Sequence, residues 1–400
     1  MAERDRGTAL IVGGSIGGLF AAAALLKNGW AVRVLERVDM ELAGRGAGIV
    51  THAPLIDALQ QVGASVENLG VAVNERLAFD RAGRVVHRLA YPQIVTSWDR
   101  IHQLLRGLMP KDAYRIGCQV SGYSDADGRV LVHLANGETL EADVLIGADG
   151  FRSSVRAGML PEVKPDYAGY VVWRGVASEA DLPSDIRGRV FPEFSFFAPN
   201  GCQVVGYPIA GPDNDLRPGH RRYNFVWYDA VPPETLDDML TDASGHRHAV
   251  SIPPPLVRDD VLAQMRAAAK ARLPAEFSTI LHHCARPFFT PIYDHYSPTF
   301  AAGRVALAGD AACVARPHVG MGVTKAAEDA LTLARCLNDM PVAEALKVYS
   351  QTRVPASRRA YEQARRLGAL IFDTDRALNT DGDQNPSIKA ILADTAVPVA

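Results

Sequence analysis

Short apolar runs that end at glycine turns are the main feature of the hydrophobic pattern along this chain. Residues 9–12, 144–147 and 305–308 are such runs, and glycine follows each of them within a few positions. A continuous apolar run of this length, bounded by a turn, predicts a strand buried on both faces of a parallel sheet. Ligands of open α/β sheets bind beyond the carboxyl ends of the strands. The pattern therefore predicts an α/β, Rossmann-like fold with a ligand site where the three turns meet.

The first turn lies in residues 9–26, where an apolar strand is followed by an alanine-rich helix. A second apolar strand ends at Glu36, close to the ~20-residue spacing of dinucleotide-binding units. We expect Gly13 to make the tight turn, Gly18 to let the helix pack against the strand, and Glu36 to accept a hydrogen bond from a ribose. Ser15 replaces the usual middle glycine, and its hydroxyl can donate to a phosphate oxygen. This segment predicts an adenine dinucleotide site, with the helix N-terminus facing the pyrophosphate.

Two other interpretations of this segment exist. Residues 8–26 carry no charge and resemble a signal or membrane helix, but the four glycines among them would weaken such a helix. Residues 13–17 also fit Gly-x-Ser-x-Gly, the turn that carries the nucleophile of serine hydrolases, with Ser15 as the nucleophile. That turn normally follows earlier strands of its sheet, and only a dozen residues precede it here. Dinucleotide binding is the favoured interpretation.

The third turn, Gly309-Asp310, leads into a loop that contains Pro317, Gly320 and Gly322 and ends at a helix N-terminus. The glycines allow a flat ligand to approach the backbone closely, and the helix turns its positive end toward the ligand. We expect Asp310 to accept hydrogen bonds from sugar or ribityl hydroxyls and to have no raised pKa.

The middle turn, Asp149-Gly150, follows a buried strand and leads into a short helix that Ser153 is placed to cap. An ordinary turn would explain Asp149-Gly150 alone. It would not explain three strand-to-glycine turns in one chain, each where a doubly wound sheet places its crevice.

Composition narrows the possibilities further. A chain of 400 residues suits two closely joined domains, and a net charge of −3 with a pI near 6.4 gives no reason to expect nucleic acid or an anionic membrane as a partner. The five cysteines form no Cys-x-x-Cys pair, which fits a reducing cytoplasm without structural disulfides. Residues 282–284, His-His-Cys, have no second ligand pair at zinc spacing, so we expect no metal site.

The three motifs together resemble the single-component FAD-dependent aromatic hydroxylases of the p-hydroxybenzoate hydroxylase type. The resemblance runs nearly from end to end and weakens after about residue 372. Within this family, the serine-containing first turn and residues 167–175, 224–228 and 316–318 are most similar to the 2,6-dihydroxypyridine 3-hydroxylases. The resemblance implies bound FAD, NADH or NADPH as a transient reductant, O₂, and a small hydroxylated aromatic substrate, with a (di)hydroxypyridine as the first candidate. It also allows a homodimer.

The resemblance assigns roles residue by residue. His318 is the candidate for proton exchange with the substrate, and Pro317, Tyr207 and Asn224 are candidates for binding the ring. Residues 44–48 resemble the family's loop beside the flavin. The candidates for holding FAD are Gly13, Ser15, Ile16, Gly18, Glu36, Arg37, Arg45, Asp149, Gly309, Asp310, Gly320, Gly322 and Val323.

Three positions depart from the family pattern. Cys313 stands where the family usually has histidine, and Thr324 where it usually has asparagine, so side-chain contacts from these two residues to FAD are in doubt. Trp98 holds the place of an arginine near the flavin, with Arg100 displaced by two positions, and we do not assign Arg100 to FAD.

The order of the motifs predicts an interleaved organisation. Residues 1–75, 96–160 and 294–372 would form the FAD-binding domain, residues 76–95 and 161–293 a smaller β-sheet domain for the substrate, and residues 373–400 a loose tail. We expect helices at 259–272 and at 323–337, the latter as the last main helix. A flavin disulfide reductase would need a second glycine fingerprint and a redox-active cysteine pair, whereas a flavoprotein without catalysis remains an alternative.

Overall fold

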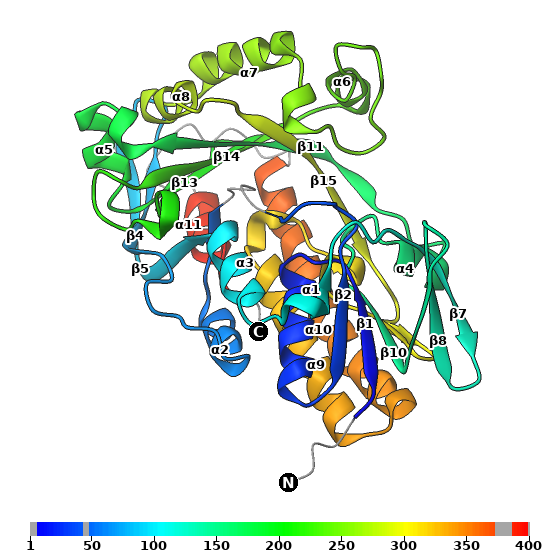
Figure 1. Ribbon diagram of the computed structural model, residues 1–400. Coiled ribbons are helices and arrows are strands. Elements are labelled where there is room, and N and C mark those ends of the chain that lie inside the picture. Colours follow the sequence, from blue (N-terminus) through cyan, green and yellow to red (C-terminus); the bar gives the residue numbers. More distant parts are fainter. Residues whose placement is uncertain (1–5, 43–47, 373–385, 399–400) are drawn as a thin grey trace.

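The computed structural model describes residues 6–42, 48–372 and 386–398 and contains three β-sheets (Figure 1). The first sheet has the strand order β16-β17-β10-β1-β2-β6. Its central strands are parallel, with β1 between β2 and β10 and with β17 on the far side of β10. The strands of this six-stranded sheet are β1 (Thr8–Val12), β2 (Ala31–Leu35), β6 (Tyr114–Arg115), β10 (Val144–Gly147), β16 (Ala301–Ala302) and β17 (Val305–Leu307).

The second sheet has nine strands in the order β18-β15-β11-β14-β13-β12-β4-β5-β3. They are β3 (Gly48–Val50), β4 (Val71–Phe79), β5 (Val85–Ser97), β11 (Asp166–Ser178), β12 (Phe194–Phe197), β13 (Cys202–Ile209), β14 (Arg222–Ala230), β15 (Phe288–Tyr296) and β18 (Cys313–Val314). The third sheet consists of β7 (Val120–Ala126), β8 (Arg129–Leu134) and β9 (Thr139–Ala142).

The helices are divided between these sheets. Helices α1 and α9 pack against each other beside the six-stranded sheet, and α7 and α8 lie on the outer face of the nine-stranded sheet (Figure 1). Their bounds are α1 (Ile16–Lys27), α2 (Ala53–Gln61), α3 (Trp98–Arg106), α4 (Ser154–Met159), α5 (Ser184–Val190), α6 (Pro233–Met239), α7 (Asp259–Arg272), α8 (Ala275–His282), α9 (Gly322–Asp339), α10 (Val342–Phe372) and α11 (Pro386–Asp394).

Alternation along β11 and β14 separates the two faces of the large sheet. Trp173 and its cross-strand partner Trp227 belong to the core beneath α7 and α8. Val172 and its partner Tyr228 belong to the opposite face, which looks toward the six-stranded sheet. Because successive strand residues point to opposite faces, Arg174 lies on the same face as Tyr228.

The structure confirms the expected strand and helix over residues 8–26 and the expected helix at 259–272, and it corrects the expectation about the last main helix. Residues 8–26 form a strand and a separate helix, not one membrane helix, and none of the helices in the described ranges has the length and hydropathy that a membrane crossing requires. The helix at 259–272 is confirmed as α7. The helix predicted at 323–337 is α9, but it is not the last main helix, because the 31-residue α10 follows it with Pro355 in its interior.

The expectation of a loose tail is wrong for residues 386–398. Residues 386–394 form α11, and Ile391 and Leu392 are buried in the apolar cluster beneath the nine-stranded sheet. The sheets divide the chain much as the predicted domains would, with residues 71–97 and 166–296 supplying most of the large sheet. The division into two domains stays a prediction.

Candidate functional site

A cavity of about 650 Å³, here called the channel, lies at the carboxyl ends of β1, β2 and β10. It brings together residues from all three sequence motifs. Of the residues expected to hold FAD, those that line it are Gly13, Ser15, Ile16, Glu36, Arg37, Asp149, Gly309, Asp310, Gly322 and Val323. Gly18 and Gly320 do not line the channel, and Arg45 lies outside the described residues.

Glycine is required in the first turn by close backbone approach. Gly13 has φ +104°, and a Cβ atom there would lie 2.4 Å from the carbonyl oxygen of Ala148, at the end of β10. A Cβ on Gly18 would lie 1.9 Å from the carbonyl oxygen of Gly13, so Gly18 shapes the turn from behind. Ser15 caps α1 without a side-chain hydrogen bond to the helix. Its hydroxyl is therefore not engaged in capping, and the helix N-terminus opens onto the channel.

The Glu36 carboxylate is buried at the side of this turn. One oxygen accepts a hydrogen bond from the Gly14 N–H at 2.8 Å, and the other accepts from the Val38 N–H at 2.9 Å. A carboxylate has about four acceptor sites, so Glu36 can hold the backbone and still accept from a ligand hydroxyl.

The Asp149 carboxylate serves the start of α4. It accepts hydrogen bonds from the backbone and hydroxyl of Ser154, and Ser153 accepts from the Arg156 N–H at 2.8 Å, which confirms Ser153 as the cap. The buried Arg156 guanidinium reaches across to the carbonyl oxygen of Ala311 at 3.1 Å. This contact ties the Asp-Gly turn to the Gly-Asp turn.

Gly309 is held from both of its peptide groups. Its N–H donates to Asp329 at 3.0 Å, and its carbonyl accepts from the Lys325 ammonium at 2.8 Å. The neighbouring Asp310 faces the cavity, and desolvation by the surrounding protein raises its pKa. The expectation that Asp310 has no raised pKa is therefore wrong. The residue is exposed to the cavity, but the sequence does not show how many protein atoms surround its carboxylate.

Two guanidinium groups add positive charge to the channel. Arg37 and Arg152 both line it and are exposed, and they are close enough for Arg37 to lower the pKa of Arg152, after the larger effect of burial. Sequence analysis did not assign Arg152 to the site. The sequence could have indicated Arg152 as a site residue, because it directly follows the Asp-Gly-Phe turn.

Of the positions that depart from the family pattern, one lines the channel and the others do not. Trp98 lines the channel, whereas Arg100 lies in a small neighbouring cavity and donates to the Glu67 carbonyl oxygen at 3.2 Å. Cys313 and Thr324 are fully buried and do not line the channel, and the Thr324 hydroxyl lies 3.0 Å from Nδ1 of His52.

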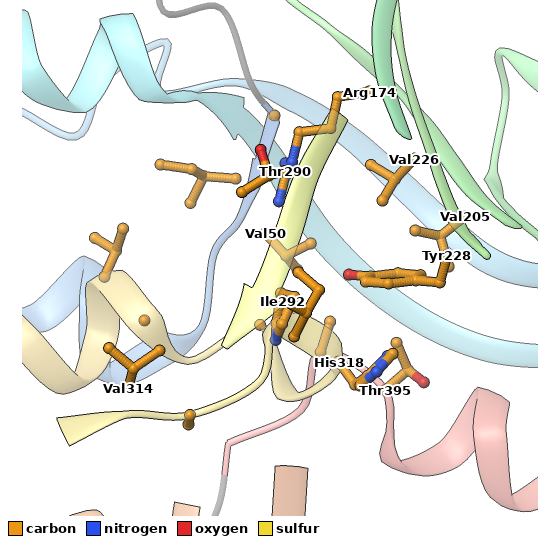
Figure 2. A pocket seen from close by; sticks show the side chains of 18 of the residues that line it. Val50, Arg174, Val205, Val226, Tyr228, Thr290, Ile292, Val314, His318 and Thr395 are labelled. Carbon is orange, nitrogen blue, oxygen red and sulfur yellow. The ribbon is translucent and has the colours of Figure 1, made fainter. Parts of the chain in front are cut away.

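A second cavity of about 340 Å³, here called the ring cavity, adjoins the channel under the nine-stranded sheet. Phe151, Asp310, Gly322 and Val323 line both spaces. Most of the remaining wall is apolar or aromatic, and Figure 2 shows the Tyr228 ring in the wall, above His318. A flat ligand in the channel therefore has a mostly apolar space beside it.

His318 lies in this wall and is 1% exposed. Its Nε2 is 2.8 Å from the Tyr170 hydroxyl, and its Nδ1 is 3.1 Å from Oε1 of Gln203. Burial, with a smaller effect of Arg316, lowers the pKa of His318 to about 3. The imidazole is therefore neutral near pH 7, and both of its nitrogens have partners.

Of the other candidates for ring binding, two line the ring cavity and one does not. Pro317 and Tyr207 line the ring cavity, together with Gly320, which the sequence had assigned to FAD. Asn224 does not line it, and its Oδ1 accepts from the Gly48 N–H at 2.8 Å. The position of Asn224 on the correct face of β14 was foreseeable, but its bond to a residue on β3 was not.

Sequence analysis missed several residues of the ring cavity. Arg174 is a half-buried cation in the wall, and Figure 2 shows its side chain running toward Thr290. Within the described ranges it makes no side-chain hydrogen bond or ion pair, although its charge opposes the rise that burial causes in the pKa of Tyr228. Burial raises that pKa to about 12, so the Tyr228 phenol stays protonated. Thr395 and Ala396 also line the cavity.

The channel fits an adenine dinucleotide with a flat ring system. It has a glycine turn that cannot hold a Cβ, an exposed helix N-terminus, a buried acid at the end of β2 and two flanking guanidiniums. Within the part of the chain that the structure describes, no three His, Cys, Asp or Glu side chains are arranged to hold a metal ion.

Comparison with known proteins agrees with this geometry. The model of the FAD binding domain family matches residues 6–183 and 258–364, and a second model, described as FAD binding domain-like, matches residues 167–294. The chain is 33% identical over 330 residues to 2,6-dihydroxypyridine 3-monooxygenase of Paenarthrobacter nicotinovorans, covering 81% of each chain. It is 28% identical to 3-amino-4-hydroxybenzoate 2-monooxygenase of Streptomyces cremeus, covering 96% of this chain and 92% of the relative.

Solved structures show the same fold. The structure of 2,6-dihydroxypyridine-3-hydroxylase from Arthrobacter nicotinovorans superimposes with a TM-score of 0.87 at 28% identity, covering 94% of this chain and 96% of the other. Klebsiella pneumoniae HpxO, solved with FAD and uric acid, gives a TM-score of 0.77 at 21% identity, covering 96% and 94% of the two chains. The family match covers more than half of this chain, and with it the glycine turn, the acid of β2 and the Gly-Asp loop. The chain therefore belongs to the FAD binding domain family and is a FAD-dependent aromatic monooxygenase.

Proposed function

We propose that this enzyme hydroxylates an electron-rich, already hydroxylated N-heteroaromatic ring, with a dihydroxypyridine as the first candidate, at the expense of NAD(P)H and O₂. The observation that carries the proposal is the ring cavity, which shares four lining residues with the FAD channel. Its mostly apolar wall holds the Arg174 guanidinium, which has no hydrogen bond or ion pair to any residue of the described ranges. The 33% identical relative is named for 2,6-dihydroxypyridine, which supports this substrate class.

The charge of the ring cavity favours an ionisable substrate. A hydroxypyridine becomes a better nucleophile when its hydroxyl loses a proton, and a nearby cation stabilises the resulting anion. Arg174 is the side chain placed to supply that charge, since most of the wall is apolar and its tyrosine phenols stay protonated. The Asp310 carboxyl also lines the cavity, where it adjoins the channel. When FAD is bound to the protein and reduced by NAD(P)H, it supplies the activation of O₂. One oxygen atom enters the ring and the other leaves as water.

His318 is our candidate for exchanging a proton with the ring hydroxyl. Its neutral imidazole donates from Nδ1 to Gln203 and accepts from the Tyr170 hydroxyl at Nε2. A hydroxyl can rotate from donor to acceptor, which would free Nε2 to take a proton. The low pKa of His318 means that it would hold this proton only briefly.

The cofactor roles that we propose follow the channel. Glu36 accepts from the adenosine ribose, Ser15 and the N-terminus of α1 bind the pyrophosphate, and Asp310 accepts from the ribityl chain. Seven further residues line the channel, which supports their assignment to FAD: Gly13, Ile16, Arg37, Asp149, Gly309, Gly322 and Val323. Gly320, in the ring cavity, and Gly18, behind the turn, support the site indirectly, and Arg45 is proposed on resemblance alone.

Two further parts of the proposal concern the enzyme's setting. The five cysteines are free and buried, which is consistent with a reducing cytoplasm. A homodimer is also proposed, and light scattering of the holoenzyme tests it.

The deciding experiment is a screen of the purified FAD enzyme for substrate-stimulated oxidation of NADH and NADPH. Hydroxypyridines and hydroxybenzoates are compared, with oxygen uptake and hydroxylated product measured in parallel. Preferential, coupled turnover of a dihydroxypyridine is expected. Stimulation by no ring compound would contradict the proposal.

Hydroxybenzoates are a second candidate substrate class. Other relatives are named for aminohydroxybenzoate or hydroxybenzoate, and a guanidinium such as Arg174 also suits a ring carboxylate. Coupled turnover of a hydroxybenzoate in the same screen would select this alternative.

A further inference from the structure

Residues 386–398, here called the C-terminal segment, pack against the substrate sheet although the sequence predicts a loose tail. Helix α11 lies against β4 and β5, on the face of the large sheet opposite α7 and α8 (Figure 1). Leu392 is fully buried and Ile391 is 2% exposed. The segment is therefore part of the core beneath the sheet.

A fully buried arginine holds the end of the segment. Arg76, on β4, donates to the carbonyl oxygens of Leu392 and Thr395, each at 2.6 Å, and of Ala396 at 3.1 Å. Its guanidinium also donates to Oε1 of Gln93 at 3.0 Å. Burying a guanidinium is costly unless its donors are satisfied, and here most of them are satisfied by the segment. Arg76 and the segment thus depend on each other.

A second contact joins the segment to the loop of the candidate site. The Ala396 N–H donates to the carbonyl oxygen of His318 at 2.9 Å. Two residues further along that loop, a Cβ on Gly320 would lie 2.9 Å from Ala396, so glycine there allows the segment to approach. Ala396 itself has φ +52°, a conformation that few residues other than glycine adopt. The backbone is held in this position by bonds on both sides.

These contacts place Thr395 in the wall of the ring cavity. Thr395 lines the cavity near His318 (Figure 2) and is 4% exposed. Its Oγ1 is buried and has no hydrogen-bond partner among the residues of the described ranges. A buried hydroxyl without a partner costs free energy, and a polar group of a bound ligand would remove that cost.

We propose that the C-terminal segment closes the ring cavity and that the Thr395 hydroxyl donates a hydrogen bond to the polar edge of the substrate, its ring oxygen substituent or ring nitrogen. This inference rests on the proposed function, since it assigns a specificity-determining residue to that site. Arg76 positions the segment and makes no contact with the substrate. The ligand class is a small ring with a hydrogen-bond acceptor on the edge that faces Thr395.

The test compares Thr395→Val, which removes the hydroxyl with little change of shape, with Thr395→Ser, which keeps it. Binding of 2,6-dihydroxypyridine to the oxidised holoenzyme is followed by the change in the visible FAD spectrum, and KM, kcat and hydrogen peroxide release are measured with NAD(P)H. We expect Thr395→Val to weaken binding and raise KM about 10-fold, with unchanged FAD content and increased peroxide release, and Thr395→Ser to restore most of the affinity.

Deletion of residues 386–400 gives an independent measurement. The deleted enzyme is expected to keep FAD, because no residue of the segment lines the channel, and to lose substrate-stimulated oxidation. If the deleted enzyme does not fold, the comparison of Thr395→Val with Thr395→Ser still tests the inference. Wild-type affinity and coupling in Thr395→Val would overturn the inference, whereas a wild-type enzyme that neither binds nor responds to any ring compound would overturn the proposed function.

Discussion

Nε2 of His318 lies 2.8 Å from the hydroxyl of Tyr170, so two buried titratable side chains share one hydrogen bond behind the wall of the ring cavity, which His318 lines and Tyr170 does not. The imidazole is neutral there because burial lowers its pKa to about 3. A proton can pass to or from His318 only if Tyr170 or Gln203 changes its hydrogen bond. The pair therefore offers separate tests of proton exchange and of simple bracing.

His318→Ala should leave FAD bound and lower coupled turnover by about 10²-fold or more, since positioned proton transfer typically contributes 10²–10⁴-fold. Unproductive oxygen use should rise, measured as peroxide released per NAD(P)H consumed. Tyr170→Phe keeps the ring but removes the hydroxyl, and it should reduce kcat more than it raises KM. Wild-type turnover and coupling in His318→Ala would return His318 to a bracing role and weaken the hydroxypyridine assignment.

Arg174→Met should shift the pH profile of kcat upward. Without the cation, the pKa of the bound ring hydroxyl rises by about 1 unit or more, and a higher pH is needed to form the anion. Arg358→Met, at an exposed position on α10, is the matched control. An unchanged profile in Arg174→Met would show that the substrate anion is stabilised elsewhere.

Glu36→Ala should weaken FAD binding about 10- to 100-fold, because a hydrogen bond to a charged group contributes about 1.5–3 kcal/mol. The carboxylate also accepts from the Gly14 N–H, so the melting temperature of the apoprotein should fall as well. Glu36→Gln keeps one acceptor oxygen, so its FAD affinity should lie between those of the wild type and Glu36→Ala. Titration of the apoprotein with FAD, followed by flavin fluorescence, gives the affinity, and an unchanged value would remove Glu36 from the ribose site.

Asp310→Ala should impair FAD retention during gel filtration without changing the fold, measured by circular dichroism. The raised pKa of Asp310 makes a proton-transfer role a real alternative to cofactor binding. The two roles separate cleanly, because a variant that keeps its full FAD and loses only ring hydroxylation would assign Asp310 to the chemistry.

The free energy of unfolding should fall as the pH is lowered from 7 to 5. Burial lowers the pKa of His52 to about 4 and of His295 and His318 to about 3. These histidines stay neutral in the folded protein but take up a proton on unfolding below about pH 6.5. Each then reduces stability by about 1.4 kcal/mol per pH unit until its folded pKa is reached. Urea unfolding at pH 7, 6 and 5 measures the slope, and equal stabilities would contradict the predicted neutral histidines.

Much of the FAD site could be predicted from the sequence because its signals are local. A strand, a glycine turn and a helix N-terminus follow one another within a few residues, as at Gly13 and Gly309, and each turn reaches the channel as expected. The aromatic walls were harder to assign. Alternation shows that neighbouring strand residues face opposite ways, but not which face of the sheet receives the ligand, so Arg174 and Tyr228 were missed.

The remaining errors have non-local causes. An interior proline normally interrupts a helix, and Pro355 gave no reason to expect one helix across residues 342–372. The C-terminal segment contains apolar residues, but its position depends on Arg76, more than 300 residues earlier in the chain. No pattern within the segment could reveal that bond.

The strand order of the six-stranded sheet has a consequence for synthesis of the protein. Residues 9–12 pair with residues 144–147, and these pair in turn with residues 305–307. On the ribosome, the first βαβ unit therefore emerges long before the strand that completes its sheet, and its apolar strand edges wait unpaired. The Gly-Asp turn that closes the channel comes later still. The channel is therefore complete only after residues 305–323 have joined the sheet, and we expect tight FAD binding to follow that step.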